Sequence, residues 1–196
     1  WGINDQKTGY DTMVPAWVGI IDSYDNTIKK AVFDPSFKDF RPTTTANWLQ
    51  YLQALERVEG LENLNTSQVT SMRRMFHGDQ ALKAIDLSHF KTDKVTDMSW
   101  MFYRCRALKE LNLSNFNTEK VTDMSELFAG CSNLSSLNIS SFNTSKVSDM
   151  TRMFYDCSAL PSLDLSMFNT EKVITMSEMF SYCTSLQDIN ISSFNT

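Results

Sequence analysis

Residues 157–180 read CSALPSLDLSMFNTEKVITMSEMF, and the same pattern recurs along most of the chain at a fixed step. Its clearest mark is the dipeptide Met-Phe, once Leu-Phe, and each copy lies 26 residues after the one before (101 − 75 = 26). Such a gapless recurrence indicates a repeat protein, in which units that cannot bury their own apolar faces stack on one another. The copies are Met75-Phe76, Met101-Phe102, Leu127-Phe128, Met153-Phe154 and Met179-Phe180.

One half of each unit alternates apolar and polar residues. Leu111 and Leu113 alternate with polar neighbours, which is typical of a short strand with one buried face. Stacked units would bring equivalent strands side by side in sequence order, so we predict one parallel ladder. The strands expected in it are Ile85–Leu87, Leu111–Leu113, Leu137–Ile139, Leu163–Leu165 and Ile189–Ile191.

The other half of each unit has a helical period. At about 100° per residue, the apolar side chains of residues 98–105 share one face of a helix. Threonine and aspartate columns precede each such segment, where they are suited to cap a helix N-terminus. We therefore predict an α/β solenoid of 26-residue units, with a parallel β ladder on one face and short helices on the other. The inward residues of one unit are Met98, Met101, Phe102 and Cys105, the outward ones Ser99, Trp100, Tyr103 and Arg104, and the capping columns Thr92, Thr118, Thr144, Thr170, Asp97, Asp123 and Asp149.

The repeat fades towards the N-terminus. Residues 28–33 have the pattern of a strand, and residues 44–52 have that of a capped helix in an atypical first unit. We expect residues 1–44 to form a capping segment and residues 45–196 to form the repeat array. The sequence stops inside a unit and does not begin with Met, so we expect a fragment that is truncated at the C-terminus and has lost any export signal.

Composition excludes several classes of function. Lys and Arg number 18 against 23 acidic residues, a net charge of −5, so nucleic acid is not an expected partner. No apolar run approaches the roughly 18 residues of a membrane span, so direct membrane insertion is not expected. The four cysteines fall in one repeat column, without the close pairs or His partners of a zinc site. We predict buried thiols there; disulfides between adjacent units are the alternative, if the Cα atoms lie within about 7 Å.

No set of residues in the sequence suggests catalysis. The two histidines, His77 and His89, have no recognisable acid–base partners. Asp86 and Asp164 lie three units apart, which puts them about 14 Å from each other on a ladder with steps of about 4.8 Å. That separation is too long for a pair of catalytic carboxylates. We therefore predict no catalytic residue, no metal site, no cofactor and no enzymatic activity.

Two surfaces remain as candidates for binding. The outer face is the more varied, and its Trp, Tyr and Arg side chains are the types enriched in protein-binding hot spots. The strand face offers a monotonous series of small polar residues, and an isolated surface aromatic without function is the third interpretation. The candidate protein-binding residues are Arg74, Trp100, Tyr103, Arg104 and Arg152, and those of the alternative strand-face site are Asn112, Asn138 and Asp164.

The repeat resembles that of BspA-like leucine-rich-repeat surface proteins of bacteria. The pattern C-S-x-L-x-x-L-x-L-S-x-F-N-T-x-K-V-x-x-M-x-x-M-F runs almost whole through residues 157–180, and residues 30–43 and 58–66 are similar to the lead-in of that family. Asp79 departs from it in place of Cys, as does Ile174 in place of Thr or Ser. The resemblance implies a leucine-rich-repeat fold, a secreted or cell-surface location, a role in adhesion and no catalytic residues.

Together, these observations favour a non-catalytic module for protein interaction or adhesion. Its expected partner is a host extracellular protein, another cell-surface protein or a glycan. A passive spacer or stalk is the alternative. A binding module should carry one chemically distinct patch, whereas a spacer should look the same along its length.

Overall fold

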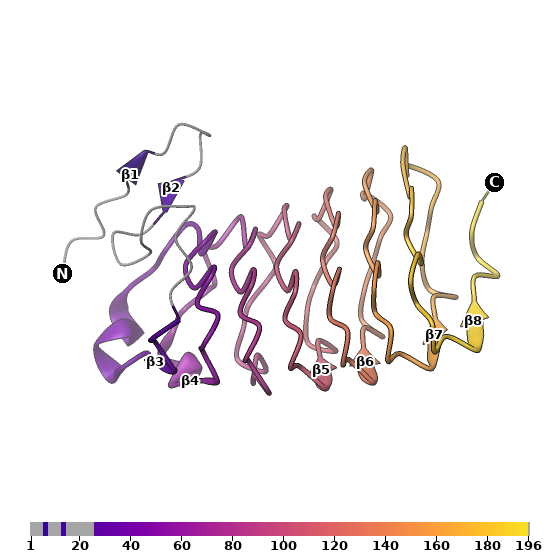
Figure 1. Ribbon diagram of the computed structural model, residues 1–196. Helices are drawn as coiled ribbons and strands as arrows, with labels where there is room; N and C mark the ends of the chain where they lie inside the picture. Colours follow the sequence, from indigo (N-terminus) through magenta and orange to yellow (C-terminus); the bar gives the residue numbers. More distant parts are fainter. Residues whose placement is uncertain (1–5, 8–12, 15–25, 196) are drawn as a thin grey trace.

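The computed structural model describes residues 6–7, 13–14 and 26–195. Strands β1 (Gln6–Lys7) and β2 (Met13–Val14) pair antiparallel. From residue 26 onward the chain winds into coils that stack in sequence order, as the change of colour in Figure 1 shows. The predicted capping segment, residues 1–44, lies partly outside the described residues and stays a prediction.

The first coils contain two strands and two 3-10 helices. Strand β3 (Lys30–Val32) pairs parallel with β4 (Arg57–Glu59), and two 3-10 helices follow these strands, η1 (Pro35–Asp39) and η2 (Leu61–Asn63). The strand expected within residues 28–33 is therefore present. The helix expected at residues 44–52 is not, because that segment forms turns.

The strand face is interrupted, so the prediction of one continuous ladder there is wrong. Strands β5 (Glu110–Asn112) and β6 (Ser136–Asn138) pair parallel, and β7 (Ser162–Asp164) and β8 (Asp188–Asn190) form a separate pair. Residues 85–87 form no strand. Pro161, next to β7, has no N–H to donate to the preceding coil, which explains the break between β6 and β7. Nothing in the structure explains the break before β5. The four strands lie along one edge of the stack (Figure 1).

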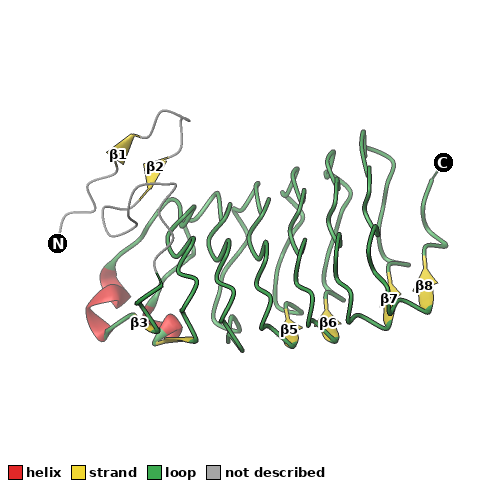
Figure 2. Ribbon diagram, in the orientation of Figure 1, coloured by secondary structure: helices red, strands yellow, loops and turns green. Residues whose placement is uncertain are grey.

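The opposite side of each coil is made of turns, so the predicted outer helices are wrong. No α-helix occurs among residues 26–195, and Figure 2 shows turns and loops over most of the stack. We call this side the turn face, and it comprises residues 44–53 and their equivalents in later coils, such as 71–80 and 97–106. Two residues per coil have positive φ, for example Trp100 (φ 62°) and Arg104 (φ 56°).

Backbone hydrogen bonds explain why turns replace helices. On the turn face every second N–H donates to the next coil, as in Trp100 N–H to Ser125 O at 2.9 Å and Phe102 N–H to Leu127 O at 3.0 Å. The intervening N–H groups close turns within the coil, as in Met101 N–H to Met98 O. Packed helices need about 8–10 Å between axes, whereas directly bonded backbones lie about 4.8 Å apart. The unbroken ladder therefore runs along the turn face, with parallel bridges at Thr44, Ser71, Asp97, Asp123, Asp149 and Thr175.

The predicted inward residues are nevertheless buried, because the turn backbone points the same apolar side chains into the stack. Successive Phe rings stack along the core, with Phe102 5.6 Å from Phe76 and 5.9 Å from Phe128 between centroids. Ser99, predicted to point outward, is buried, and its hydroxyl donates to the Asp97 carboxylate at 2.7 Å. The inward residues Met98, Met101, Phe102 and Cys105 are all fully buried.

The threonine and aspartate columns cap turns and coils, not helices. The Thr118 hydroxyl donates to Asn143 O at 2.9 Å and accepts from Asn143 N–H at 2.7 Å, so it joins two coils. Asp123 accepts the N–H of Ser125 at 2.8 Å and so caps a turn. The cysteines are free thiols, as predicted, and Cys131 donates to Phe102 O at 3.1 Å. Three of them are buried, whereas Cys183 is only half-buried, so the prediction of burial is wrong for that one. No helix in the described residues is long and apolar enough to cross a membrane.

Candidate functional site

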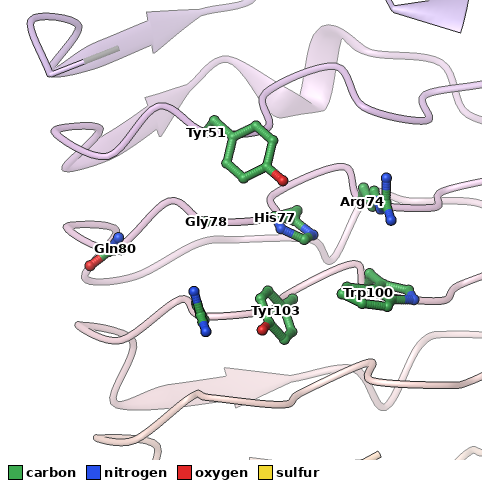
Figure 3. Close-up of a pocket in the computed structure, with 8 residues that line it drawn as sticks. Tyr51, Arg74, His77, Gly78, Gln80, Trp100 and Tyr103 are labelled. Carbon is green, nitrogen blue, oxygen red and sulfur yellow. The ribbon is translucent and has the colours of Figure 1, made fainter. Parts of the chain in front are cut away.

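A small cavity opens on the turn face, between the first coils. Its volume is about 190 Å³. Figure 3 shows that three successive coils contribute to it, with Tyr51 on the first, His77 on the second and Tyr103 on the third. The lining residues are Tyr51, Arg74, His77, Gly78, Gln80, Trp100, Tyr103 and Arg104.

Gly78 allows the first two coils to approach at this point. Its φ is +80°, and a Cβ atom there would lie 2.9 Å from Cδ1 of Tyr51. Any other residue would therefore be strained and would push the Tyr51 ring away. The absence of a side chain at Gly78 thus leaves room for the Tyr51 ring at this side of the cavity.

His77 is the centre of an aromatic cluster. Its ring lies 4.8 Å from Tyr51, 4.6 Å from Tyr103 and 5.6 Å from Trp100, measured between centroids. Trp100 and Tyr103 also pack together at 4.9 Å. Distances in this range give favourable ring contacts beyond simple burial, so the cluster is preorganised.

Two arginines cover the cluster. The guanidinium carbon of Arg74 lies 4.9 Å from the centre of the Trp100 ring, and that of Arg104 lies 5.0 Å from the centre of Tyr103. Both contacts have cation–π geometry. Among the residues described, neither arginine forms an ion pair. Glu126, on the next coil, is within electrostatic range of both, and burial raises the pKa of its carboxyl group.

The environment of His77 keeps its ring neutral. Burial, followed by the charges of Arg74, Arg104 and Arg73, lowers the pKa of His77 to about 3. The ring is therefore unsuited to acid–base catalysis near neutral pH. Two polar atoms of the cluster are buried with no hydrogen-bond partner among the described residues: Nδ1 of His77 and Nε of Arg74.

The predicted binding residues divide into two groups. Four of them, Arg74, Trp100, Tyr103 and Arg104, line the cavity. The fifth, Arg152, lies two coils further on, where it pairs with Glu178 at 2.9 Å. His77 also lines the cavity, although it was not among the predicted residues. It occupies the same repeat column as Tyr103, and this is the signal that could have identified it.

The side chains of the alternative strand-face site are exposed, and each accepts a hydrogen bond from the backbone of its own turn. Asn112 accepts the N–H of Ser114 at 3.1 Å, and Asn138 accepts that of Ser140 at 3.2 Å. Asp164 does the same with Ser166, and this hydrogen bond lowers the pKa of its carboxyl group. These side chains therefore stabilise their own turns.

His89 lies in a second, wider hollow. Its volume is about 460 Å³, and its other polar walls include Lys38, Glu62 and Lys91. It contains no paired aromatic and cationic groups of the kind seen around His77. No cluster of three metal-ligating side chains occurs in the part of the chain that the structure describes.

Comparison with known structures finds bacterial leucine-rich-repeat proteins. One from Eubacterium ventriosum has 15% sequence identity and a TM-score of 0.49, over 87% of this chain and 45% of that one. One from Bacteroides ovatus has 17% identity and a TM-score of 0.38, over 83% of this chain and 45% of that one. The chain thus spans less than half the length of either. No curated protein matches.

A protein-family model described as "Mycoplasma protein of unknown function, DUF285" matches residues 43–111 and 106–196. Both matches lie in the stack of coils, and they overlap over residues 106–111. Because they cover most of the sequence, the chain belongs to the DUF285 family.

Proposed function

We propose that this chain is a non-catalytic protein-interaction module that binds its partner on the turn face around Trp100. The observation that supports this most is the cavity itself, where aromatic and arginine side chains of three coils converge. Partly buried Trp, Tyr and Arg groups can contribute most of the binding energy of an interface, since they combine apolar area with directed hydrogen bonds.

The contrast with the strand face favours this choice of surface. Asn112, Asn138 and Asp164 are bonded within their own turns, so a partner would gain little from them. A passive spacer would have uniform coils. Here the outward side chains change from coil to coil over an unchanged backbone, which favours a binding role.

A glycan partner is less well supported. Sugar rings stack on open aromatic faces, but the Trp100 ring already contacts His77, Tyr103 and the Arg74 guanidinium. The polar atoms of the cluster that have no partner in the described residues, Nε of Arg74 and Nδ1 of His77, suit a polar protein side chain better than the face of a sugar ring.

We further propose a secreted or surface-anchored bacterial location, with an adhesive role towards a host extracellular or other cell-surface protein. The support is the resemblance of the repeat to BspA-like leucine-rich-repeat solenoids. Protease treatment of intact cells that carry the full-length protein would test the location: a surface protein is digested, whereas an internal one is protected.

The binding experiment is a screen of the chain against purified extracellular proteins and glycans, followed by variants. The double variant Trp100→Ala, Arg74→Ala should bind the partner identified in the screen at least tenfold more weakly than the wild type. Arg152→Ala is the matched control, because Arg152 occupies the same repeat column as Arg74 with a similar φ (53° against 55°). Unchanged binding by the double variant, with loss in Asn112→Ala, Asn138→Ala, would move the site to the strand face.

A further inference from the structure

The two arginines of the cavity, Arg74 and Arg104, differ from the cations that form ion pairs elsewhere in the chain. Arg152 pairs with Glu178, Lys83 with Glu56, and Arg57 with Glu59. Arg74 and Arg104 have no such partner in the described region, although the whole chain has a net charge of −5. Two guanidinium groups beside one cavity, neither of them in an ion pair, are suited to bind an anion.

Two buried nitrogen atoms without hydrogen-bond partners in the described region indicate that a ligand with an oxygen acceptor binds here. Within residues 26–195, the buried Nε–H of Arg74 has no acceptor, and Nδ1 of His77 has no partner either. Buried donors without acceptors are rare and costly, so each needs an explanation. An oxygen acceptor within hydrogen-bond distance of Nε would satisfy Arg74, and the His77 tautomer with its proton on Nδ1 is likewise a donor that an acceptor would satisfy.

The local charge selects the kind of anion. Arg73, Arg74 and Arg104 are the cations around His77, and Asp97 and Glu126 are the carboxylates around Arg74. His77 therefore has three cations and no carboxylate among its charged neighbours, whereas Glu126 and Asp97 lie within range of Arg74. A single carboxylate complements the cations, whereas a phosphate dianion would place more negative charge beside Glu126.

The size and walls of the cavity select the same group. A volume of about 190 Å³ is below the roughly 300–1,000 Å³ of small-molecule sites, so it fits one side chain. The rings of Tyr51 and Tyr103 offer apolar walls to methylene groups, while Arg74 and Arg104 offer donors to a terminal carboxylate.

We propose that this cavity binds the carboxylate of an Asp or Glu side chain of the protein partner, with Arg74 and Arg104 as its donors and the ring cluster around its methylene groups. This rests on the proposed function and specifies what it recognises. The arginines are fixed over Trp100 and Tyr103, so little side-chain entropy is lost when the carboxylate enters.

The test uses the whole chain and three capped peptides, acetyl-Gly-Glu-Gly-amide and its Gln and phosphoserine counterparts. The Trp100 indole and His77 ring NMR signals report binding, assigned with Trp100→Phe and His77→Phe. We expect the Glu peptide to shift both signals with an affinity on the order of millimolar, as befits one side chain. The Gln peptide should bind at least tenfold more weakly. Equal binding of both, or no shift with either, overturns the proposal, and tighter binding of the phosphoserine peptide assigns the site to phosphate instead.

Variants locate the site. Arg74→Gln and Arg104→Gln should each weaken the Glu peptide at least tenfold, and Arg152→Gln should not change it. If Arg74→Gln fails to fold, Arg74→Lys, which keeps the charge but loses the Nε–H, should still weaken binding at least threefold. An equal loss with Arg152→Gln would mean non-specific attraction and overturn the proposal. If the Glu peptide does not bind but the partner still requires Trp100, the carboxylate inference fails and the proposed function stands.

Discussion

The turn face around Trp100 and the turn face around Arg152 share a backbone and differ in their side chains. Both have four hydrogen bonds to the next coil and two residues with positive φ. In both regions arginines lie over aromatic rings, and the guanidinium carbon of Arg152 lies 5.4 Å from the centre of the Tyr155 ring. The difference is the ion pair: Arg152 pairs with Glu178, whereas Arg74 and Arg104 form no ion pair in the described region. The repeat thus maintains the same backbone in both regions, and the side chains that differ in the outward columns give the region around Trp100 its distinct chemistry.

The coil of His77 departs from the repeat on its inner side as well. Asp79 occupies the column of the cysteines and is fully buried. One carboxylate oxygen accepts Leu52 N–H at 3.0 Å, while the other has no partner. The region around Trp100 therefore contains polar groups that the region around Arg152 lacks, and such groups are a cost to stability that function can explain.

The largest expected effect concerns what the two regions share. Phe128 lies on the coil between that of Trp100 and that of Arg152, and its ring stacks between Phe102 and Phe154. Phe128→Ala should lower the free energy of unfolding by about 3–5 kcal/mol, because a full ring is lost from a packed core. Urea denaturation measures it. A loss below about 1 kcal/mol would mean that the stack does not depend on the Phe column, and the shared scaffold would be wrong.

The second prediction concerns the pH dependence that His77 gives to its region. The pKa of His77 is about 3 in the fold against 6.5 in an ordinary histidine, so acid protonates the unfolded chain first. The contribution of His77 to stability is lost as the pH falls from 6.5 towards 3, at about 1.4 kcal/mol per unit, or about 2 kcal/mol at pH 5. In His77→Phe, urea denaturation at pH 7 and pH 5 should no longer show the part of the pH-dependent loss in the free energy of unfolding that comes from His77. His89→Gln, at the exposed histidine, is the control and should keep the wild-type loss; equal behaviour of the two variants contradicts the prediction.

Asp79 should show the opposite pH dependence. Burial raises the pKa of its carboxyl group well above 3.8, so the fold holds a proton that the unfolded chain releases. The resulting cost is absent below pH 3.8 and grows as the pH rises towards the pKa in the fold. Asp79→Asn, which keeps an acceptor for Leu52, should raise stability at pH 7 by at least about 1 kcal/mol, with the gain gone at pH 3.5. Asp164→Asn, at an exposed carboxylate, should give no gain; a gain at both pH values for Asp79→Asn would indicate packing instead of titration.

The inner columns and the Trp100 cluster were predictable from sequence, whereas the backbone was not. Met98, Met101 and Phe102 are inward in a helix and in these turns alike, so periodicity could not distinguish the two. Positive φ at Arg74 or Trp100 cannot be recognised in the sequence, because no glycine occupies their repeat column. On the turn face, glycine has positive φ only at Gly78 and Gly130. His77 was assessed only as a catalytic group, although its role comes from rings on neighbouring coils.

The smallest expected effect compares Arg74 with Arg152 directly. Both are half-buried, in the same column and at positive φ, so Gln substitutions impose the same backbone strain on each. Arg152→Gln breaks an ion pair whose side chains are 43% and 45% exposed, and such exposed pairs contribute little, so a slight loss of stability is expected. Arg74→Gln removes a cation that burial and Arg73 disfavour, as the lowered pKa of Arg74 indicates, so stability should stay equal or rise. Parallel thermal unfolding at pH 7 measures both signs. If Arg74→Gln is the more destabilising of the two, Arg74 serves mainly to hold Trp100 in place, and the contrast between a binding region and an ion-paired region would not hold.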